Sequence, residues 1–283
     1  MSAARITVPA EARAALLAAG CLLAITAVAL LAPIFLGADP MAQSLGNRLL
    51  PPAWLQDGKP AHLLGTDHLG RDLLARTVQG LRVSLVIGLI AASGAGLIGV
   101  TLGMLAGYHG GRLGRVVMRL ADIQLAFPLL VLAIAILGIV GTSVAALVIV
   151  LCLFGWAVYA RVVRAAVLVQ RQSDYVLAAR VAGAGHARIM FHHLLPNVIS
   201  AVIVLWTFSI AQMIILEGAL SFLGLGVKPP DPSLGSIMND GRQVIDLAWW
   251  LTVFPGLLLV ALVVALNALG DALRDWLDPR SHR

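Results

Sequence analysis

The chain has 283 residues, of which 60% are apolar and only 12% are charged, and its mean hydropathy is +0.93. An ordinary soluble domain carries about 45–50% apolar and about 25% charged residues. The composition therefore excludes an ordinary soluble domain and indicates a membrane protein. The formal net charge is +6, but the basic residues sit mostly beside apolar runs, which favours membrane topology over nucleic-acid binding. We expect a lipid bilayer around this chain and no nucleic-acid partner.

Stretches without Asp, Glu, Lys or Arg mark candidate crossings, because a charge at the bilayer centre costs at least about 2.5–3.5 kcal/mol. The first is residues 14–38, which is longer than the apolar region of a cleaved signal peptide; residues 1–38 are therefore interpreted as an N-terminal segment and a retained helix. Residues 39–81 follow as a loop outside the cytoplasm, ending in an interfacial helix anchored by Arg76 and Arg82. Residues 83–111 form the second crossing.

The next charge-free stretch, residues 123–160, is too long for one untilted crossing, and Gly138, Gly141, Thr142 and Ser143 interrupt it. It predicts two helices joined by a tight turn. Residues 189–216 contain a helix that we expect to begin near Pro196, and residues 247–270 form the last crossing. The chain is therefore predicted to be an all-α polytopic membrane protein with six transmembrane helices.

Arginines in the short connections set the orientation, since the cytoplasmic side retains the excess of positive charge. They gather before the first helix, between helices two and three, between four and five, and after helix six. Both termini are thus expected in the cytoplasm, with a permease core over residues 82–273, a cytoplasmic loop over 161–197 and a tail over 274–283. The segment 224–241 is rich in proline and is expected to be an external loop rather than a regular helix.

The sequence lacks the parts of an energy-converting enzyme. No phosphate-binding loop is present, and the only two lysines, Lys59 and Lys228, each precede a proline. We expect no catalytic residue, cofactor or metal site on this chain. The deepest acid, Glu217, is a candidate pathway or gate residue, although it can equally be a hydrogen-bonded acid facing the bundle. Together with Asp122 it keeps open a carrier driven by an ion gradient.

Small residues cluster in the loop between helices four and five. Ala178, Ala179, Ala182 and Gly183 share one face of a helical turn, which lets another protein's surface approach closely. Gly183 suits the end of that helix. In the second crossing, Gly99, Gly103 and Gly107 are spaced for close helix packing, within this chain or, less favoured, against another subunit.

The pair Ala178–Ala179, followed by Gly183 and by Leu195–Pro196, resembles the EAA loop of bacterial ATP-binding-cassette importer permeases. Leu177 stands where that loop often has an acid, and His193 where it often has an aliphatic residue. Further segments resemble the C-type permease subunit of the dipeptide, oligopeptide and nickel branch of these importers: 64–72, 106–111, 126–128, 174–176, 220–226, 270–275 and 277–280.

This resemblance implies a type I importer permease fold, called MetI-like, in the bacterial inner membrane. It implies a non-catalytic subunit that pairs with a homologous B-type permease, rests on two ATPases that bind ATP and Mg²⁺, and receives cargo from an extracytoplasmic binding protein. The cargo would be dipeptides or oligopeptides, with nickel or glutathione as alternatives. The residues expected to couple the chain to the ATPases are Tyr175, Ala178, Ala179, Ala182, Gly183, Ala184 and Pro196.

Overall fold

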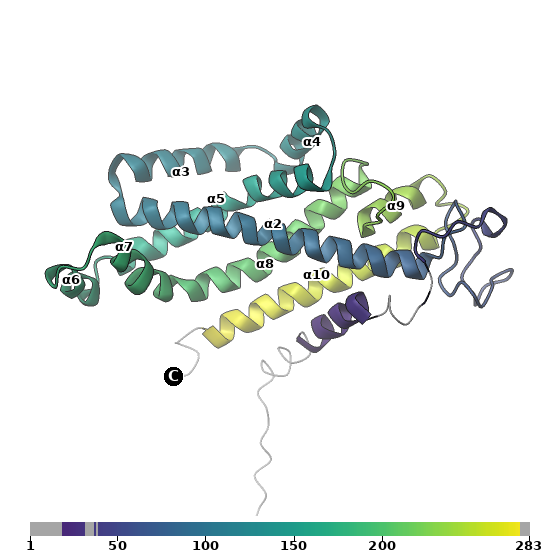
Figure 1. The fold of residues 1–283 in the computed structure, drawn as a ribbon, viewed down its shortest axis with the longest axis horizontal. Helices are drawn as coiled ribbons and strands as arrows, with labels where there is room; N and C mark the ends of the chain where they lie inside the picture. Colours follow the sequence, from purple (N-terminus) through teal and green to yellow (C-terminus); the bar gives the residue numbers. More distant parts are fainter. Residues whose placement is uncertain (1–18, 32–36, 38, 278–283) are drawn as a thin grey trace, which may run out of the picture.

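The computed structural model describes residues 19–31, 37 and 39–277, and this part of the chain is helical apart from its connections. Four long helices run along the long axis of the molecule, and the shorter ones lie at its ends or beside them (Figure 1). The helices are Ala19–Leu31, η1 (Leu45–Asn47), α2 (Leu73–His109), α3 (Gly111–Ala126), α4 (Leu129–Val140), α5 (Val144–Gln170), α6 (Asp174–Val181), α7 (His186–Arg188), the π-helix η2 (Ile189–Leu194), α8 (Leu195–Phe222), α9 (Leu234–Arg242) and α10 (Trp250–Leu277).

The apolar helices are consistent with the six predicted crossings. Four are long enough to span a bilayer alone: α2, α5, the continuous 186–222 segment that ends in α8, and α10. Counted as one bent span, α3 and α4, which meet at a 90° bend, make a fifth candidate crossing by length and composition. The helix Ala19–Leu31 lies within the predicted first crossing, residues 14–38. Parts of both ends of that crossing lie outside the described residues. Residues 1–18 of the N-terminal segment and 278–283 of the tail also lie outside them.

The second crossing begins earlier than predicted, because α2 runs without a break from Leu73. The Asp72 side chain accepts a hydrogen bond from the backbone N–H of Ala75, which caps the helix. No proline follows until after His109, so nothing separates an interfacial helix from the crossing. The separate helix expected before residue 82 is therefore wrong, and Arg76 is buried instead of lying at an interface.

Glycines bring α2 and α5 into direct contact, which confirms that the spacing serves packing within this chain. A β-carbon on Gly99 would lie 2.3 Å from the Trp156 carbonyl oxygen, and one on Gly103 would lie 2.7 Å from that of Ala160. Such distances leave no room for a side chain, so the two backbones pack against each other.

The third crossing differs most from the prediction, since its helix begins at Gly111 rather than near residue 123. Gly110 and Gly111 both have positive φ and turn the chain directly after α2. Arg112, Arg115 and Arg119, expected in a connection, therefore lie on α3. Pro128 ends α3 because it disfavours helical backbone at Phe127, which is extended. Pro128 therefore lies at the 90° bend between α3 and α4, whereas α10 continues as one helix through Pro255.

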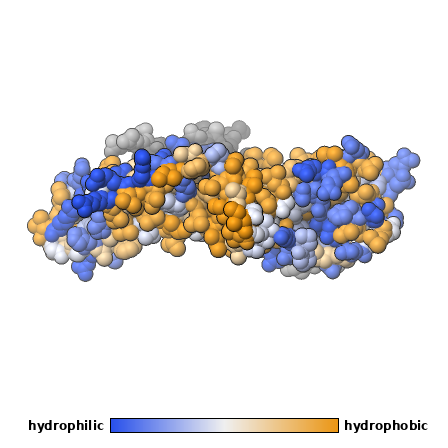
Figure 2. All heavy atoms as spheres, turned by 90° about the horizontal axis from the view of Figure 1, so that it is seen from above, coloured by the Kyte–Doolittle hydropathy of each residue, from blue (hydrophilic) through white to orange (hydrophobic). Residues whose placement is uncertain are grey.

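Polar residues gather at the two ends of the molecule, with an apolar belt between them (Figure 2). The α6 segment lies at one end, and the loop before α2 lies with α9 at the other (Figure 1). The structure corrects the expectation of an irregular loop over 224–241. Its second half is α9, which begins with a capping box in which Ser233 and Ser236 each accept a backbone N–H bond from the other.

Candidate functional site

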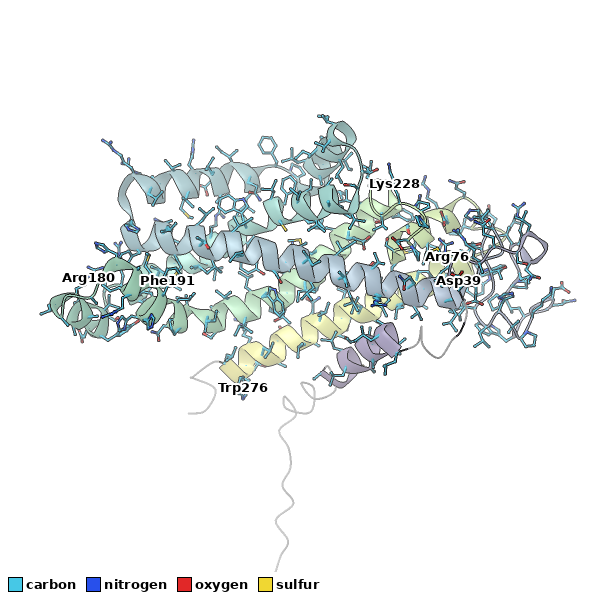
Figure 3. The ribbon with its side chains drawn as sticks, in the orientation of Figure 1. Asp39, Arg76, Arg180, Phe191, Lys228 and Trp276 are labelled. Carbon is cyan, nitrogen blue, oxygen red and sulfur yellow. The ribbon has the colours of Figure 1, made fainter. Side chains whose placement is uncertain are left out.

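The segment between α5 and α8 is shorter and more helical than the predicted loop 161–197. Helix α5 continues to Gln170 and helical backbone resumes at His186, so the chain leaves the helices only over residues 171–185, within which α6 forms. We call residues 171–197 the coupling segment. Its outermost residues project from the end of the molecule, where Figure 3 labels Arg180 and Phe191.

One side chain of α6 anchors it to the helices behind it. Val176 is fully buried, in a cluster with Tyr108 of α2, Val167 of α5 and Val198 of α8. The other side of α6 is open: Ala178, the following Ala182 and Gly183 are exposed. The structure thus presents a surface of small residues on a helix that is fixed from behind.

Gly183 turns the chain at the end of α6. Its φ is +80°, and the Ala184 N–H bonds to the Ala179 carbonyl at 3.0 Å, the long bond of a Schellman motif. A β-carbon on Gly183 would meet nothing within 4 Å. Glycine is therefore needed here for its backbone conformation, while the space outside it is free in the described chain.

The seven predicted coupling residues lie along one short stretch of this segment. Tyr175, Ala178, Ala182, Gly183 and Pro196 are exposed, and Ala179 and Ala184 are half-buried. The Tyr175 hydroxyl donates to Gln170 Oε1 at 2.8 Å and accepts from Asn197 Nδ2 at 3.2 Å, so it links the end of α5 to the start of α8.

Large apolar side chains surround the small residues. Val181 is 90% exposed and Phe191 62%, and Leu177 is also exposed. Such side chains at the polar end of a membrane protein favour contact with another protein. They were not predicted, since a lone apolar residue in a polar loop has no distinctive spacing.

The sequence analysis also missed the residues that hold the coupling segment. The Tyr108 hydroxyl lies 2.8 Å from His186 Nδ1, and the Arg180 guanidinium lies 5.5 Å from the centre of the Tyr108 ring. Arg171 Nη1 donates to the Gly107 carbonyl at 3.0 Å, at the end of α2. The one indication in the sequence was that the 106–111 motif, which contains Tyr108, lies at the end of the second crossing.

Glu217 is fully buried where α8, α2 and α9 meet. Its carboxylate accepts hydrogen bonds from Ser84 of α2 at 2.7 Å and from Ser221 of α8 at 2.6 Å. The Ser84 hydroxyl accepts in turn from the Leu234 N–H at 3.4 Å, at the start of α9. This geometry favours the hydrogen-bonded acid over an open gate, and a role for Glu217 in the pathway stays a prediction.

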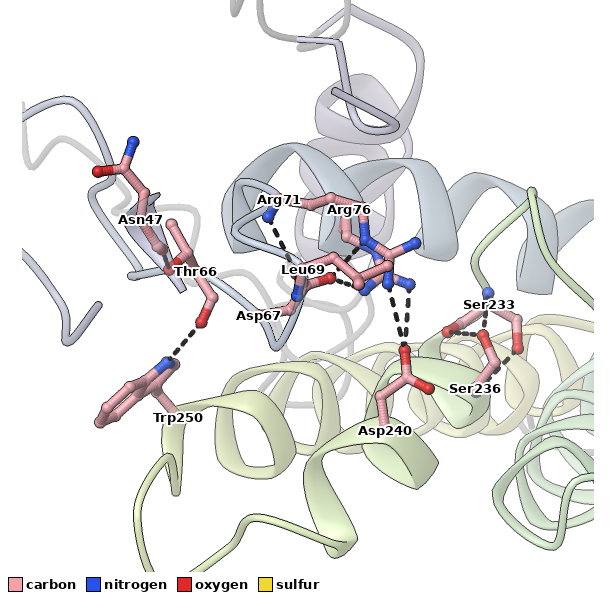
Figure 4. A network of polar contacts seen from close by, with 10 residues as sticks. All are labelled: Asn47, Thr66, Asp67, Leu69, Arg71, Arg76, Ser233, Ser236, Asp240 and Trp250. Carbon is pink, nitrogen blue, oxygen red and sulfur yellow. Dashed lines mark hydrogen bonds and ion pairs between the residues drawn. The ribbon is translucent and has the colours of Figure 1, made fainter. Parts of the chain in front are cut away.

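A buried ionic cluster joins the first loop to the helices (Figure 4). It lies at the end opposite the coupling segment, as the positions of Arg76 and Arg180 in Figure 3 show. Asp67 is fully buried; its carboxylate accepts from Arg71 Nε at 2.6 Å and from the Arg76 guanidinium. Arg76 Nη2 also reaches Asp240 of α9 at 3.3 Å. Beside the cluster, the Trp250 indole N–H donates to the Thr66 carbonyl at 3.2 Å.

Burial of Asp67 raises its pKa, but the Arg76 charge, the Arg71 N–H and guanidinium and the Leu69 N–H together outweigh burial. The pKa of Asp67 is thereby held below its ordinary value of 3.8. The carboxylate is charged in the folded protein, and it neutralises part of the excess of basic residues in the first loop.

Within residues 19–31, 37 and 39–277, no three His, Cys, Asp or Glu side chains are grouped so that they could hold a metal ion. The expectation that this chain carries no cofactor stays a prediction.

Comparisons with known proteins agree with the resemblance seen in the sequence. Residues 99–283 match the family model described as "Binding-protein-dependent transport system inner membrane component". The chain is 45% identical over 259 residues to the di/tripeptide transport system permease protein DppC of Pseudomonas aeruginosa, covering 92% of this chain and 86% of that protein.

Two further relatives align with this chain over most of their own length. The dipeptide transport system permease protein DppC of Haemophilus influenzae is 41% identical over 268 residues, which cover 95% of this chain and 91% of that protein. The glutathione transport system permease protein GsiD of Pectobacterium atrosepticum is 42% identical over 220 residues, which cover 78% and 73%.

Proposed function

The chain belongs to the family of inner membrane components of binding-protein-dependent transport systems, and we propose on that basis that it is the membrane-spanning permease subunit of an ATP-driven importer of short peptides. The observation that carries its mechanism is the coupling segment. Small exposed residues lie on α6 and directly after it, and the helix is held from behind by the buried Val176 and by Arg180 against the Tyr108 ring.

A force applied to α6 is transmitted to the helices because several contacts join them. Tyr108 ends α2, Arg171 follows α5, and His186 begins the helical stretch that leads into α8. A partner that moves the coupling segment therefore moves the ends of three long helices together, and these helices cross the apolar belt. Alternating access requires such a rigid connection between the motor and the crossings.

The partners follow from this arrangement. Two ATPase subunits that bind ATP and Mg²⁺ would dock at the coupling segment and supply the energy, since this sequence has no phosphate-binding loop. A homologous B-type permease would complete the pathway, and an extracytoplasmic binding protein would deliver cargo at the end formed by the first loop and α9. We infer from this orientation that both termini lie in the cytoplasm, and from the missing phosphate-binding loop that the chain is a non-catalytic subunit.

Short peptides are the favoured cargo. Two of the relatives are named for di/tripeptide and dipeptide transport, and one is named for transport of glutathione, which is itself a peptide. Glutathione is therefore the second candidate. Nickel and an ion-gradient-driven carrier are the further alternatives, and Glu217 bonded to two serines does not favour the carrier.

Ala182→Trp tests the proposal, since Ala182 is exposed beside the small residues of α6. The complex is purified through a tag on this chain and reconstituted in vesicles with its binding protein. We expect the variant to insert normally but to lose the ATPase subunits and peptide uptake.

Ala61→Trp is the matched control, because Ala61 is exposed in the first loop at the opposite end. It should retain the ATPase subunits. An Ala182→Trp complex with normal ATPase content and uptake would contradict the proposal, as would peptide transport by the purified chain alone under a proton gradient.

A further inference from the structure

A small cavity of about 200 Å³ opens at the bend between α3 and α4. Its wall comes from four helices: Gln124 and Phe127 at the end of α3, Leu129 at the start of α4, Phe154 of α5, and Gln212 with Met213 of α8. Phe127 is 56% exposed at its edge. We call this cavity the α3–α4 notch.

The notch lies inside the apolar belt. A β-carbon on Gly155, one of its lining residues, would touch both Met213 and Ala95 of α2 at about 2.5 Å. Ala95 is near the middle of the charge-free stretch 83–111. The notch therefore lies level with the middle of α2, and the exposed Asp122–Arg161 ion pair lies within three residues of its lining residues Gln124 and Val158.

Two carboxamides line this otherwise apolar region. Gln124 Nε2 donates to the Phe154 carbonyl at 2.6 Å, in the middle of α5, and the Gln212 side chain is exposed. Polar side chains at membrane depth face the interior of an assembly or a water-filled path, because lipid offers them no hydrogen bonds. The Gln212 face of α8 is therefore not expected to face lipid.

The bend adds backbone acceptors to the same place. The last turn of a helix leaves carbonyl groups without partners inside the helix, and α3 stops at Ala126 because of Pro128. Interrupted helices at membrane depth line cargo sites in other transporters, since their freed backbone groups can bind polar parts of a cargo.

We propose that the α3–α4 notch is a contact point for the peptide backbone of the cargo as it crosses the membrane, an inference that rests on the proposed function. Carboxamides can donate to and accept from a peptide group and do not select for charge. Phe127 and Val158, which are both exposed in the lining, supply an apolar wall for side chains of varied size. A cavity of this volume is smaller than the roughly 300–1,000 Å³ of pockets that enclose a whole drug-sized ligand. It therefore contacts one part of a peptide, and the partner permease would supply the opposite wall.

Gln212→Leu in the reconstituted complex is the first test, with uptake of radiolabelled dialanine and ATP hydrolysis as readouts. We expect uptake to fall about fivefold, the effect of one lost hydrogen bond, while the ATPase subunits remain bound. Thr101→Val is the control, because Thr101 is an exposed polar residue of α2 whose hydroxyl donates to Leu97 of its own helix. It should transport normally.

A second measurement does not depend on the activity of the leucine variant. In a Gln212→Cys complex, a small water-soluble maleimide should label the new cysteine, and excess dialanine during turnover should slow the labelling. The inference is overturned if the Gln212→Leu complex takes up peptide at the wild-type rate. It is also overturned if the cysteine stays unlabelled in every nucleotide state because the partner permease covers it. If the wild-type complex imports no peptide, the proposed function itself fails.

Discussion

The Arg76 guanidinium lies 3.3 Å from the Asp240 carboxylate, although 164 residues separate them in the chain. Arg76 is in the first turns of α2 and Asp240 is in α9, so the contact fixes α9 against the crossing helices. Asp67 binds the same guanidinium from the first loop. The cluster therefore holds three separate parts of the chain together at the end opposite the coupling segment.

Replacing Asp67 by alanine tests this cluster. The change leaves Arg71 and Arg76 close together with only the partly exposed Asp240 as a partner, and breaking a buried ion pair in this way costs about 3–5 kcal/mol. We expect a clear loss in the thermal unfolding midpoint of the purified protein. Asp246→Ala is the control, since Asp246 is exposed and a surface change of this kind shifts stability by no more than about 0.5 kcal/mol. Equal midpoints for the two variants would show that the cluster adds nothing.

Acid should weaken the same cluster. The pKa of Asp67 in the folded protein is below its ordinary value of 3.8, so the unfolded chain takes up a proton before the folded chain does. The stability from this carboxylate is thus complete above the ordinary value and is lost as the pH falls through the folded pKa. Unfolding of the wild type and of Asp67→Asn across this acid range should converge at low pH. A difference that stays constant would exclude Asp67 as the titrating group.

The long helices could be predicted from charge-free stretches, but their ends could not. A charge-free stretch shows which residues can lie in lipid, whereas the end of a helix depends on local backbone conformation and capping. The paired positive φ of Gly110 and Gly111 starts α3 within a basic segment, and the Asp72 cap starts α2 before the apolar run. Both features override the position of the charges.

The close packing of α2 on α5 predicts that Gly99 tolerates no side chain. In Gly99→Ala the new methyl group would lie 2.3 Å from the Trp156 carbonyl oxygen and 2.5 Å from Tyr159 Cβ, and such overpacking costs about 1–3 kcal/mol. We expect lower yield and a lower unfolding midpoint. Gly138→Ala in α4 is the matched control because a β-carbon there meets nothing within 4 Å. Similar behaviour of both variants would show that the helices separate easily.

Glu217→Gln distinguishes a structural acid from a proton-carrying one. Glutamine keeps an acceptor for Ser84 or Ser221 and never ionises, so we expect normal peptide uptake and a small change in stability. Glu217→Leu leaves both hydroxyl groups without this acceptor and should lower stability by about 1–3 kcal/mol. Uptake by the reconstituted complex and thermal unfolding check both. Loss of uptake in a stable Glu217→Gln complex would instead support the gate.

The coupling residues show what a motif reveals and what it omits. The alanine and glycine spacing predicted a smooth surface, and Ala178, Ala182 and Gly183 are exposed as that required. The residues that support the surface are far apart in sequence: 78 positions separate Tyr108 from His186. Their contact depends on the parallel packing of α2 and α5, which brings the C-terminal ends of both helices to the coupling segment; no local sequence pattern contains this arrangement.

Tyr108→Phe tests whether that support transmits force. The substitution keeps the ring beneath the Arg180 guanidinium but removes the hydroxyl group that lies 2.8 Å from His186 Nδ1. The ATPases would still dock on an unchanged outer surface, while the start of the 186–222 helical stretch would follow them less closely. We expect normal ATPase content and fewer peptides imported per ATP hydrolysed, measured in vesicles. Tyr159→Phe is the control, since its hydroxyl lies in the apolar belt 3.5 Å from the Ala92 carbonyl and has no contact with the coupling segment. An unchanged ratio in Tyr108→Phe would mean that Val176 and the apolar cluster transmit the motion without this hydrogen bond.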